Sequence, residues 1–106
     1  MITLYIRYTV DPKKLRDFET YAQALATPIE RCGGIPGGYY LPTKFAGPTN
    51  AAIGLIDFPN LAAYEKYREK LATDPEATEI ARRVEASGAI LNEDRSIVSC
   101  VRESRR

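Results

Sequence analysis

The stretch ITLYIRYTV, residues 2–10, determines how the rest of the chain is interpreted. Four apolar or aromatic side chains alternate along it with four others: Ile2, Leu4, Ile6 and Tyr8 against Thr3, Tyr5, Arg7 and Thr9. Because successive side chains of a strand point to opposite faces, this alternation predicts a β-strand with two different faces. One face is apolar, and the other carries Tyr5 and Arg7.

Helix signals follow this strand at three places. Asp11-Pro12 supplies an N-cap acid and a proline at the first helical position, opening an amphipathic helix that ends at Gly33-Gly34. Pro28 lies inside this helix and is expected to bend it or to split off its last turn. Asn60 caps a second predicted helix, and Asp74-Pro75 opens a third.

Three further strands complete the predicted fold. Residues 35–42 indicate a short edge strand containing proline and glycine, residues 51–58 an almost wholly apolar central strand, and residues 96–102 a final strand. The order is β-α-β-β-α-β with one extra helix before the last strand, which is typical of a ferredoxin-like α+β domain with a four-stranded antiparallel sheet. Residues 1–106 are expected to form a single domain, with residues 102–106 as a solvated tail.

The predicted sheet has one face that its own helices do not cover. In this plan the helices pack on the face opposite Tyr5 and Arg7. Apolar and aromatic residues of the other strands must share the uncovered face with Tyr5. A second copy of the sheet is the simplest cover, so the sequence predicts a homodimer.

Composition narrows the classes of partner and cofactor. Fifteen basic and fourteen acidic residues leave a formal net charge of +1, which favours neither nucleic acid nor a membrane surface as partner. No apolar run is long enough to span a bilayer. The chain has no histidine, and Cys32 and Cys100 lie far apart, so we expect no metal site and no cofactor. Two distant thiols are typical of a reduced protein, and the expected location is cytoplasmic.

Four residues form the candidate ligand site: Tyr5, Arg7, Tyr40 and Asp57. On the uncovered face, Arg7 is suited to bind a carboxylate or a polarised carbonyl, with a tyrosine hydroxyl as donor. Only one of Tyr39 and Tyr40 can share that face, and Tyr40 is preferred. Asp57 is a possible counter-ion of Arg7 because their strands are neighbours; in the alternative interpretation the two charges are a structural pair and the tyrosines fill space. Three other tyrosines recur at helical core spacing and are expected to be structural: Tyr21, Tyr64 and Tyr67.

Several spaced segments resemble the NIPSNAP family. They are GYYLP at residues 38–42, FPNLAAYEKYR at residues 58–68 and TDPE at residues 73–76. The resemblance covers essentially the whole chain and implies a ferredoxin-like fold that pairs into a dimeric α+β barrel. Similar members tend to have histidines where this chain has Pro36-Gly37, so no proton-transfer or metal role is carried over to those positions.

The resemblance implies no established general activity. The expected function is that of a NIPSNAP-like homodimer that binds a small organic molecule in its barrel lumen. The alternative is a cofactor-independent monooxygenase or isomerase in which Arg7 and a tyrosine stabilise an enolate-like anion. A third possibility, RNA binding, has the same strand order but lacks the aromatic recognition motif in residues 51–58.

Overall fold

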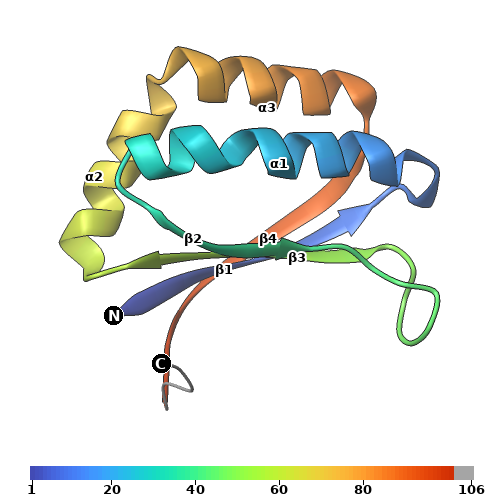
Figure 1. Cartoon of the computed structure of the whole chain (residues 1–106), viewed down its shortest axis with the longest axis horizontal. Coiled ribbons are helices and arrows are strands. Elements are labelled where there is room, and N and C mark those ends of the chain that lie inside the picture. Colours follow the sequence, from blue (N-terminus) through green and yellow to red (C-terminus); the bar gives the residue numbers. More distant parts are fainter. Residues whose placement is uncertain (102–106) are drawn as a thin grey trace.

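The computed structural model describes residues 1–101, and three helices lie on one side of a four-stranded sheet (Figure 1). The strands are β1 (Ile2–Val10), β2 (Ile35–Tyr40), β3 (Ala51–Phe58) and β4 (Ile90–Ser99). The helices are α1 (Leu15–Arg31), preceded by a 3-10 turn at Pro12–Lys14, α2 (Leu61–Ala72) and α3 (Pro75–Ser87). The strand order β2-β3-β1-β4, antiparallel throughout, is that of a ferredoxin-like α+β fold. No helix within residues 1–101 has the length and apolar character needed to cross a membrane.

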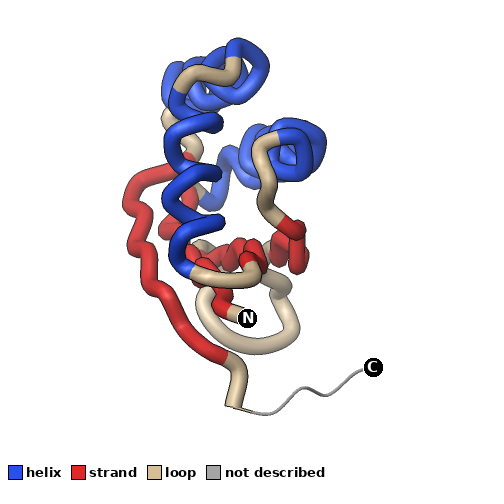
Figure 2. The backbone as a smooth tube through the Cα atoms, turned by 90° about the vertical axis from the view of Figure 1, so that its left-hand side faces the viewer, coloured by secondary structure: helices blue, strands red, loops and turns tan. Residues whose placement is uncertain are grey.

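The two faces of β1 separate as its sequence predicts. Leu4, Ile6, Tyr8 and Val10 are buried beneath the helices, opposite the alternate residues of β3 that end in Phe58. Tyr5 lies on the other face, where its register partner on β3 is Leu55. Figures 1 and 2 show all three helices on the inner face of the sheet and none on the outer face.

The predicted caps begin the helices. The Asn60 side chain accepts from the backbone N–H of Ala63 at 2.9 Å, and the Asp74 side chain accepts from that of Ala77 at 2.9 Å. The helix α1 does not split at Pro28 but continues to Arg31. Proline removes only one hydrogen bond at this position, and its ring is buried in the core.

The last strand is longer and earlier than its sequence indicates. It was predicted over residues 96–102, whereas β4 runs from Ile90 to Ser99. Residues 92–95 are polar, so the hydrophobicity pattern does not indicate a strand there. The backbone nevertheless pairs with β1 from Val10 opposite Ile90 onward, with a shift in register between Thr9 and Val10. Residues 102–106, which include the predicted tail, lie outside the described residues.

The helix α3 stands apart from the sheet. Within residues 1–101 its main packing contacts are with α1 and α2 rather than with any strand, and Figures 1 and 2 show it farther from the sheet than α1. Polar contacts attach both of its ends to the α1 region. Arg31 donates to both carboxylate oxygens of Asp74 at 2.9 and 2.7 Å, and the Lys14 ammonium donates to the Ser87 carbonyl at 2.6 Å.

The two end contacts give a testable prediction about α3. Replacing both anchors, Lys14→Gln and Arg31→Gln, should loosen α3 while the sheet stays folded, because the sheet does not depend on these contacts. We expect amide hydrogen exchange in α3 to rise a few-fold while exchange in β1 and β3 stays the same. The control is Arg82→Gln, which removes an ion pair with Glu79 inside α3 itself. Equal protection of α3 in the double variant and the wild type would contradict the anchoring role.

Candidate functional site

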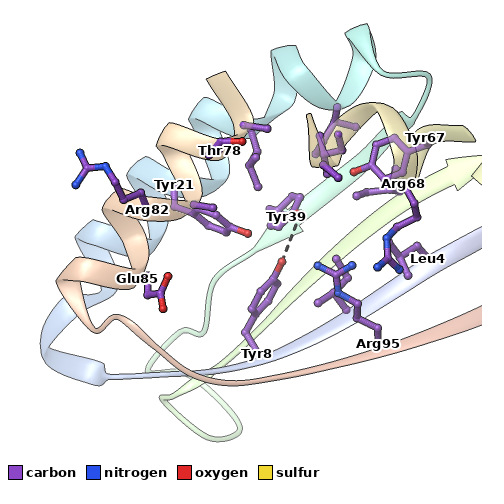
Figure 3. A pocket seen from close by; sticks show the side chains of 18 of the residues that line it. Leu4, Tyr8, Tyr21, Tyr39, Tyr67, Arg68, Thr78, Arg82, Glu85 and Arg95 are labelled. Carbon is purple, nitrogen blue, oxygen red and sulfur yellow. Dashed lines mark hydrogen bonds between the residues drawn. The ribbon is translucent and has the colours of Figure 1, made fainter. Parts of the chain in front are cut away.

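A cavity of about 690 Å³ lies where α3 stands off the sheet (Figure 3). We call it the α3 cavity. Its floor is the inner face of β1, with Leu4, Ile6 and Tyr8, and its roof is α3, with residues such as Thr78 and Ala81. Side chains of α1, α2, β2, β3 and β4 complete its walls. The cavity is therefore built from segments spread along the whole described chain.

Tyrosines form the middle of the α3 cavity. The Tyr8 hydroxyl donates to the Tyr39 hydroxyl at 3.4 Å, and the two ring centroids are 6.1 Å apart. Tyr21 of α1 lies edge-on to Tyr8 at a centroid distance of 6.5 Å. Figure 3 shows the three hydroxyls gathered between the sheet and α3. This cluster combines aromatic surface with groups that can donate a hydrogen bond.

Gly54 makes room for the Tyr39 ring. Gly54 is the register partner of Tyr39 on the neighbouring strand. A Cβ atom at position 54 would lie 2.7 Å from the ring of Tyr39, closer than real contacts allow. The absence of a side chain there allows the ring to lie over β3, within reach of Tyr8. A glycine in an otherwise apolar central strand thus has a positioning role.

Burial keeps these phenols protonated. Desolvation raises the pKa of Tyr8, Tyr21 and Tyr39 above the ordinary value, and it raises the pKa of Tyr67 to about 12. For Tyr8, the neighbouring rings of Tyr21 and Tyr39 add to the rise. At neutral pH the tyrosines of the cavity are therefore neutral hydroxyls rather than bases, and because Tyr8 donates its proton to Tyr39, the Tyr39 hydroxyl is the one of this pair that can donate to a ligand oxygen.

Two arginines line one end of the α3 cavity. Arg95 is on the inner face of β4, opposite Ile6, and its Nε donates to a Glu93 carboxylate oxygen at 2.7 Å. Arg68 of α2 also lines the cavity, and it donates to the Tyr64 hydroxyl at 2.9 Å. In Figure 3 both guanidinium groups extend toward the end of the cavity where Leu4 lies. This end combines positive charge with an apolar floor.

The four residues predicted from sequence lie elsewhere, and none of them lines the α3 cavity. Tyr5, Arg7 and Asp57 are on the outer face of the sheet, and Tyr40 pairs there with Ile53. The Tyr40 hydroxyl donates to the carbonyl of Gly37 at 3.5 Å, and Tyr40 is one of the residues that line a second hollow, between α1 and β2.

The structure does not pair Arg7 with Asp57. Antiparallel register puts Asp57 opposite Thr3, whose hydroxyl donates to it at 2.6 Å. Arg7 is opposite Ile53 on that side, and its nearest acid is Asp94 on β4, at 4.0 Å. The two strands are neighbours as predicted, but the register separates the two charges along them. With 63% of its side chain exposed, Arg7 is a solvated surface charge.

Sequence reasoning missed the residues that line the α3 cavity. Tyr21 and Tyr67 were expected to be structural; they do pack in the core, and they also line the cavity. Tyr8 was assigned to the apolar face, where it was the one residue with a hydroxyl. Glu93 and Arg95 carried a signal, because two charges on the inner face of a strand indicate that no helix packs closely over it.

The composition of the cavity does not suit a metal ion. Among residues 1–101, no three histidine, cysteine, aspartate or glutamate side chains come close enough together to hold one. The cavity presents phenol hydroxyls, guanidinium groups and hydrocarbon, which are groups that hold an organic molecule.

Comparisons with known proteins identify both a family and a fold. The sequence model of the NIPSNAP family matches residues 4–105. An uncharacterized NIPSNAP-like domain protein from Burkholderia xenovorans superposes with a TM-score of 0.80 and 22% identity, over 99% of this chain and 89% of that chain. A NIPSNAP family protein of unknown function from Agrobacterium tumefaciens gives a TM-score of 0.83 and 17% identity, over 98% and 91% of the two chains.

A more distant structural neighbour is an enzyme. SnoaB, a cofactor-independent oxygenase from Streptomyces nogalater, superposes with a TM-score of 0.66 and 15% identity, over 99% of this chain and 97% of that chain. At such identities the likeness concerns the fold alone. No protein of curated function matches the sequence.

Alkaline titration tests the burial of the tyrosines. The folded state holds the Tyr67 proton up to about pH 12, whereas the unfolded chain releases it near the ordinary value of 10.0. The resulting stability is complete below the unfolded pKa and is lost as the pH rises through the folded pKa. We expect the free energy of unfolding, measured in urea, to fall between these two pH values, and to fall less steeply in Tyr67→Phe. The same slope in both proteins would contradict the assigned burial.

Proposed function

The chain belongs to the NIPSNAP family, and we propose that it binds a small, largely apolar organic molecule in the α3 cavity. One observation carries this proposal: α3 packs on α1 and is attached to it at both ends, leaving a hollow, open on one side, between α3 and the sheet. A space of about 690 Å³ lies within the range of small-molecule sites. Its lining combines aliphatic side chains with tyrosine hydroxyls and charged groups, which can orient a bound molecule.

The proposal moves the ligand from the outer face of the sheet to the inner face. On the outer face, Arg7 is exposed and Asp57 already has a partner in Thr3. On the inner face, Tyr8 and Tyr39 are held in place by packing and by their mutual hydrogen bond. A ligand gains affinity from groups that are already positioned, and the single chain provides such groups on the inner face without a partner.

Binding has more support than catalysis. The fold likeness to an oxygenase leaves the chemistry of this chain open, because one fold hosts many activities. The raised pKa of Tyr8 and Tyr39 makes them hydrogen-bond donors rather than proton acceptors at neutral pH. Tyr5 and Arg7, the pair on which the oxygenase or isomerase alternative relied, lie on the far side of the sheet from the cavity.

A fluorescent probe tests the proposed site. N-phenylnaphthylamine, which is neutral and apolar, should bind with saturable fluorescence at one site per chain. Ala81→Trp, on the roof of the cavity, should weaken binding about tenfold or more by occupying the space, a loss of about 1.4 kcal/mol.

The matched control for the probe is Ala86→Trp. It adds the same ring to an exposed position of the same helix, outside the cavity lining. Its affinity for the probe should equal that of the wild type. Absence of saturable binding, or equal weakening by the two tryptophans, would refute the proposed site.

We also propose that the protein is a homodimer through the outer face of its sheet. The helices leave that face uncovered (Figure 2). Apolar side chains of three strands share it, and Ile35 and Val98 are 46% and 44% exposed. An apolar sheet face of this kind is covered most simply by its own copy, because a two-fold interface needs only one self-complementary patch.

Sedimentation tests the homodimer. The wild type should sediment at twice the chain mass of 11.8 kDa. A charge at the centre of the outer face, Leu55→Lys, or at its side, Val98→Lys, should shift the protein toward the single-chain mass. Leu61→Lys is the control, because Leu61 is 58% exposed on α2, away from that face. A wild type of single-chain mass in dilute solution would overturn the proposal.

We further propose that the protein is located in the cytoplasm. Cys32 is buried at the end of α1. Cysteine thiols stay reduced in a compartment such as the cytoplasm, so a buried thiol is compatible with this location.

A further inference from the structure

Resting on the proposed function, the geometry points to a more specific ligand class: a flat aromatic molecule that carries one carboxylate. The ring system would lie between the floor of the α3 cavity, which includes Tyr8, and its roof on α3. The carboxylate would lie at the end where Arg95 and Arg68 are found. Three features of the cavity support this inference.

The first feature is the floor. Aliphatic side chains of the adjoining walls continue the β1 floor of Leu4 and Ile6: Leu25 and Ile29 of α1 and Ile56 of β3. The aromatic rings of Tyr8 and Tyr39 continue this surface at a tilt of 34° to each other. Aromatic ligands pack well on such edges and tilted faces, which favours a planar ring over a flexible chain.

The second feature is the incomplete pairing of Arg95. Its Nε and Nη2 both engage the same oxygen of Glu93, each at 2.7 Å. A guanidinium group has five N–H donors in a rigid fork, so Glu93 occupies one edge of it. The side chain is 43% exposed and lines the cavity. The rest of the fork is therefore open to an oxygen of a ligand.

The third feature is the balance of charge along the lining. The charged side chains are three arginines and two glutamates: Arg68, Arg82, Arg95, Glu69 and Glu85. Arg82 is already engaged by Glu79 at 2.6 Å, through a carboxylate outside the cavity lining. In Figure 3, Glu85 and Arg82 lie at the opposite end from Arg68 and Arg95. The end with Leu4 thus holds two guanidinium groups, those of Arg68 and Arg95, while Glu93 pairs with one edge of Arg95 and Glu69 follows Arg68 in α2.

The cost of removing water from the two arginines favours an anionic ligand over a neutral one. Any molecule that fills the cavity displaces water from Arg95 and Arg68. Removing water from a cation without a new partner is unfavourable, whereas a ligand carboxylate supplies both charge and acceptors. A neutral ring of the same size should therefore bind less tightly than the acid.

A matched pair of probes tests the ligand class. Naphthalene carboxylate and the corresponding naphthamide have the same ring and nearly the same shape but differ in charge. By titration calorimetry on the full chain, we expect the carboxylate to bind about tenfold more tightly than the amide, and we expect this ratio to shrink at high salt.

Variants of Arg95 show where the preference arises. Arg95→Gln should bring the carboxylate-to-amide ratio close to one, and Arg95→Lys should restore part of it because it restores the charge. Arg16→Gln is the matched control, since Arg16 is exposed on α1 and does not line the cavity; its ratio should equal that of the wild type. Circular dichroism confirms that each variant is folded.

The outcomes separate the ligand class from the proposed site. Equal affinity for acid and amide, no binding of either, or a ratio that survives Arg95→Gln would each overturn the carboxylate inference. If N-phenylnaphthylamine still binds with saturation and is blocked by Ala81→Trp, the proposed site remains supported although the carboxylate inference has failed. If that neutral probe fails as well, the proposed function fails with it.

Discussion

Two polar contacts hold α3 on α1 instead of on the sheet, and the rest of the site depends on them. Arg31 donates hydrogen bonds to the capping carboxylate of Asp74 at the start of the helix, and Lys14 donates to the carbonyl of Ser87 at its end. Between them, the apolar side chains of Ile80 and Val84 are buried. Because α3 packs on α1, it does not cover the inner face of β4, where Arg95 and Ile97 stay partly exposed, whereas the inner residues of β1 are buried.

The strand β1 gives the protein two surfaces with different tasks. Its inner residues, Leu4, Ile6 and Tyr8, form the floor of the α3 cavity, and its outer residues face the proposed partner. The position of an arginine on the sheet then determines its role. Arg7 is a solvated charge on the outer face, whereas Arg95 lies among hydrocarbon and phenols on the inner face. The two surfaces differ because successive side chains of a strand point to opposite faces of the sheet.

Much of the fold follows from local sequence patterns, and little of the site does. The alternation in residues 2–10 and the capping residues Asn60 and Asp74 act through neighbours in sequence, so they predict β1, α2 and α3 correctly. The start of β4 was not predicted because its residues are polar. They form a strand through backbone hydrogen bonds to β1, which leave no hydrophobic pattern in the sequence. The α3 cavity was not predicted because the spacing between α3 and the sheet depends on Arg31 and Lys14, which contact residues more than 40 positions away in the sequence. The family resemblance gave the fold and left the chemistry open.

The central claim is that the ligand lies on the inner face of the sheet, and methyl-resolved nuclear magnetic resonance tests it most directly. With naphthalene carboxylate bound, or N-phenylnaphthylamine where the acid does not bind, we expect Overhauser contacts from the aromatic ring to the methyl groups of Leu4, Ile6 and Leu25. Contacts to the methyl groups of Ile53, Leu55 and Val98 instead would place the ligand on the outer face and refute a site on the inner face.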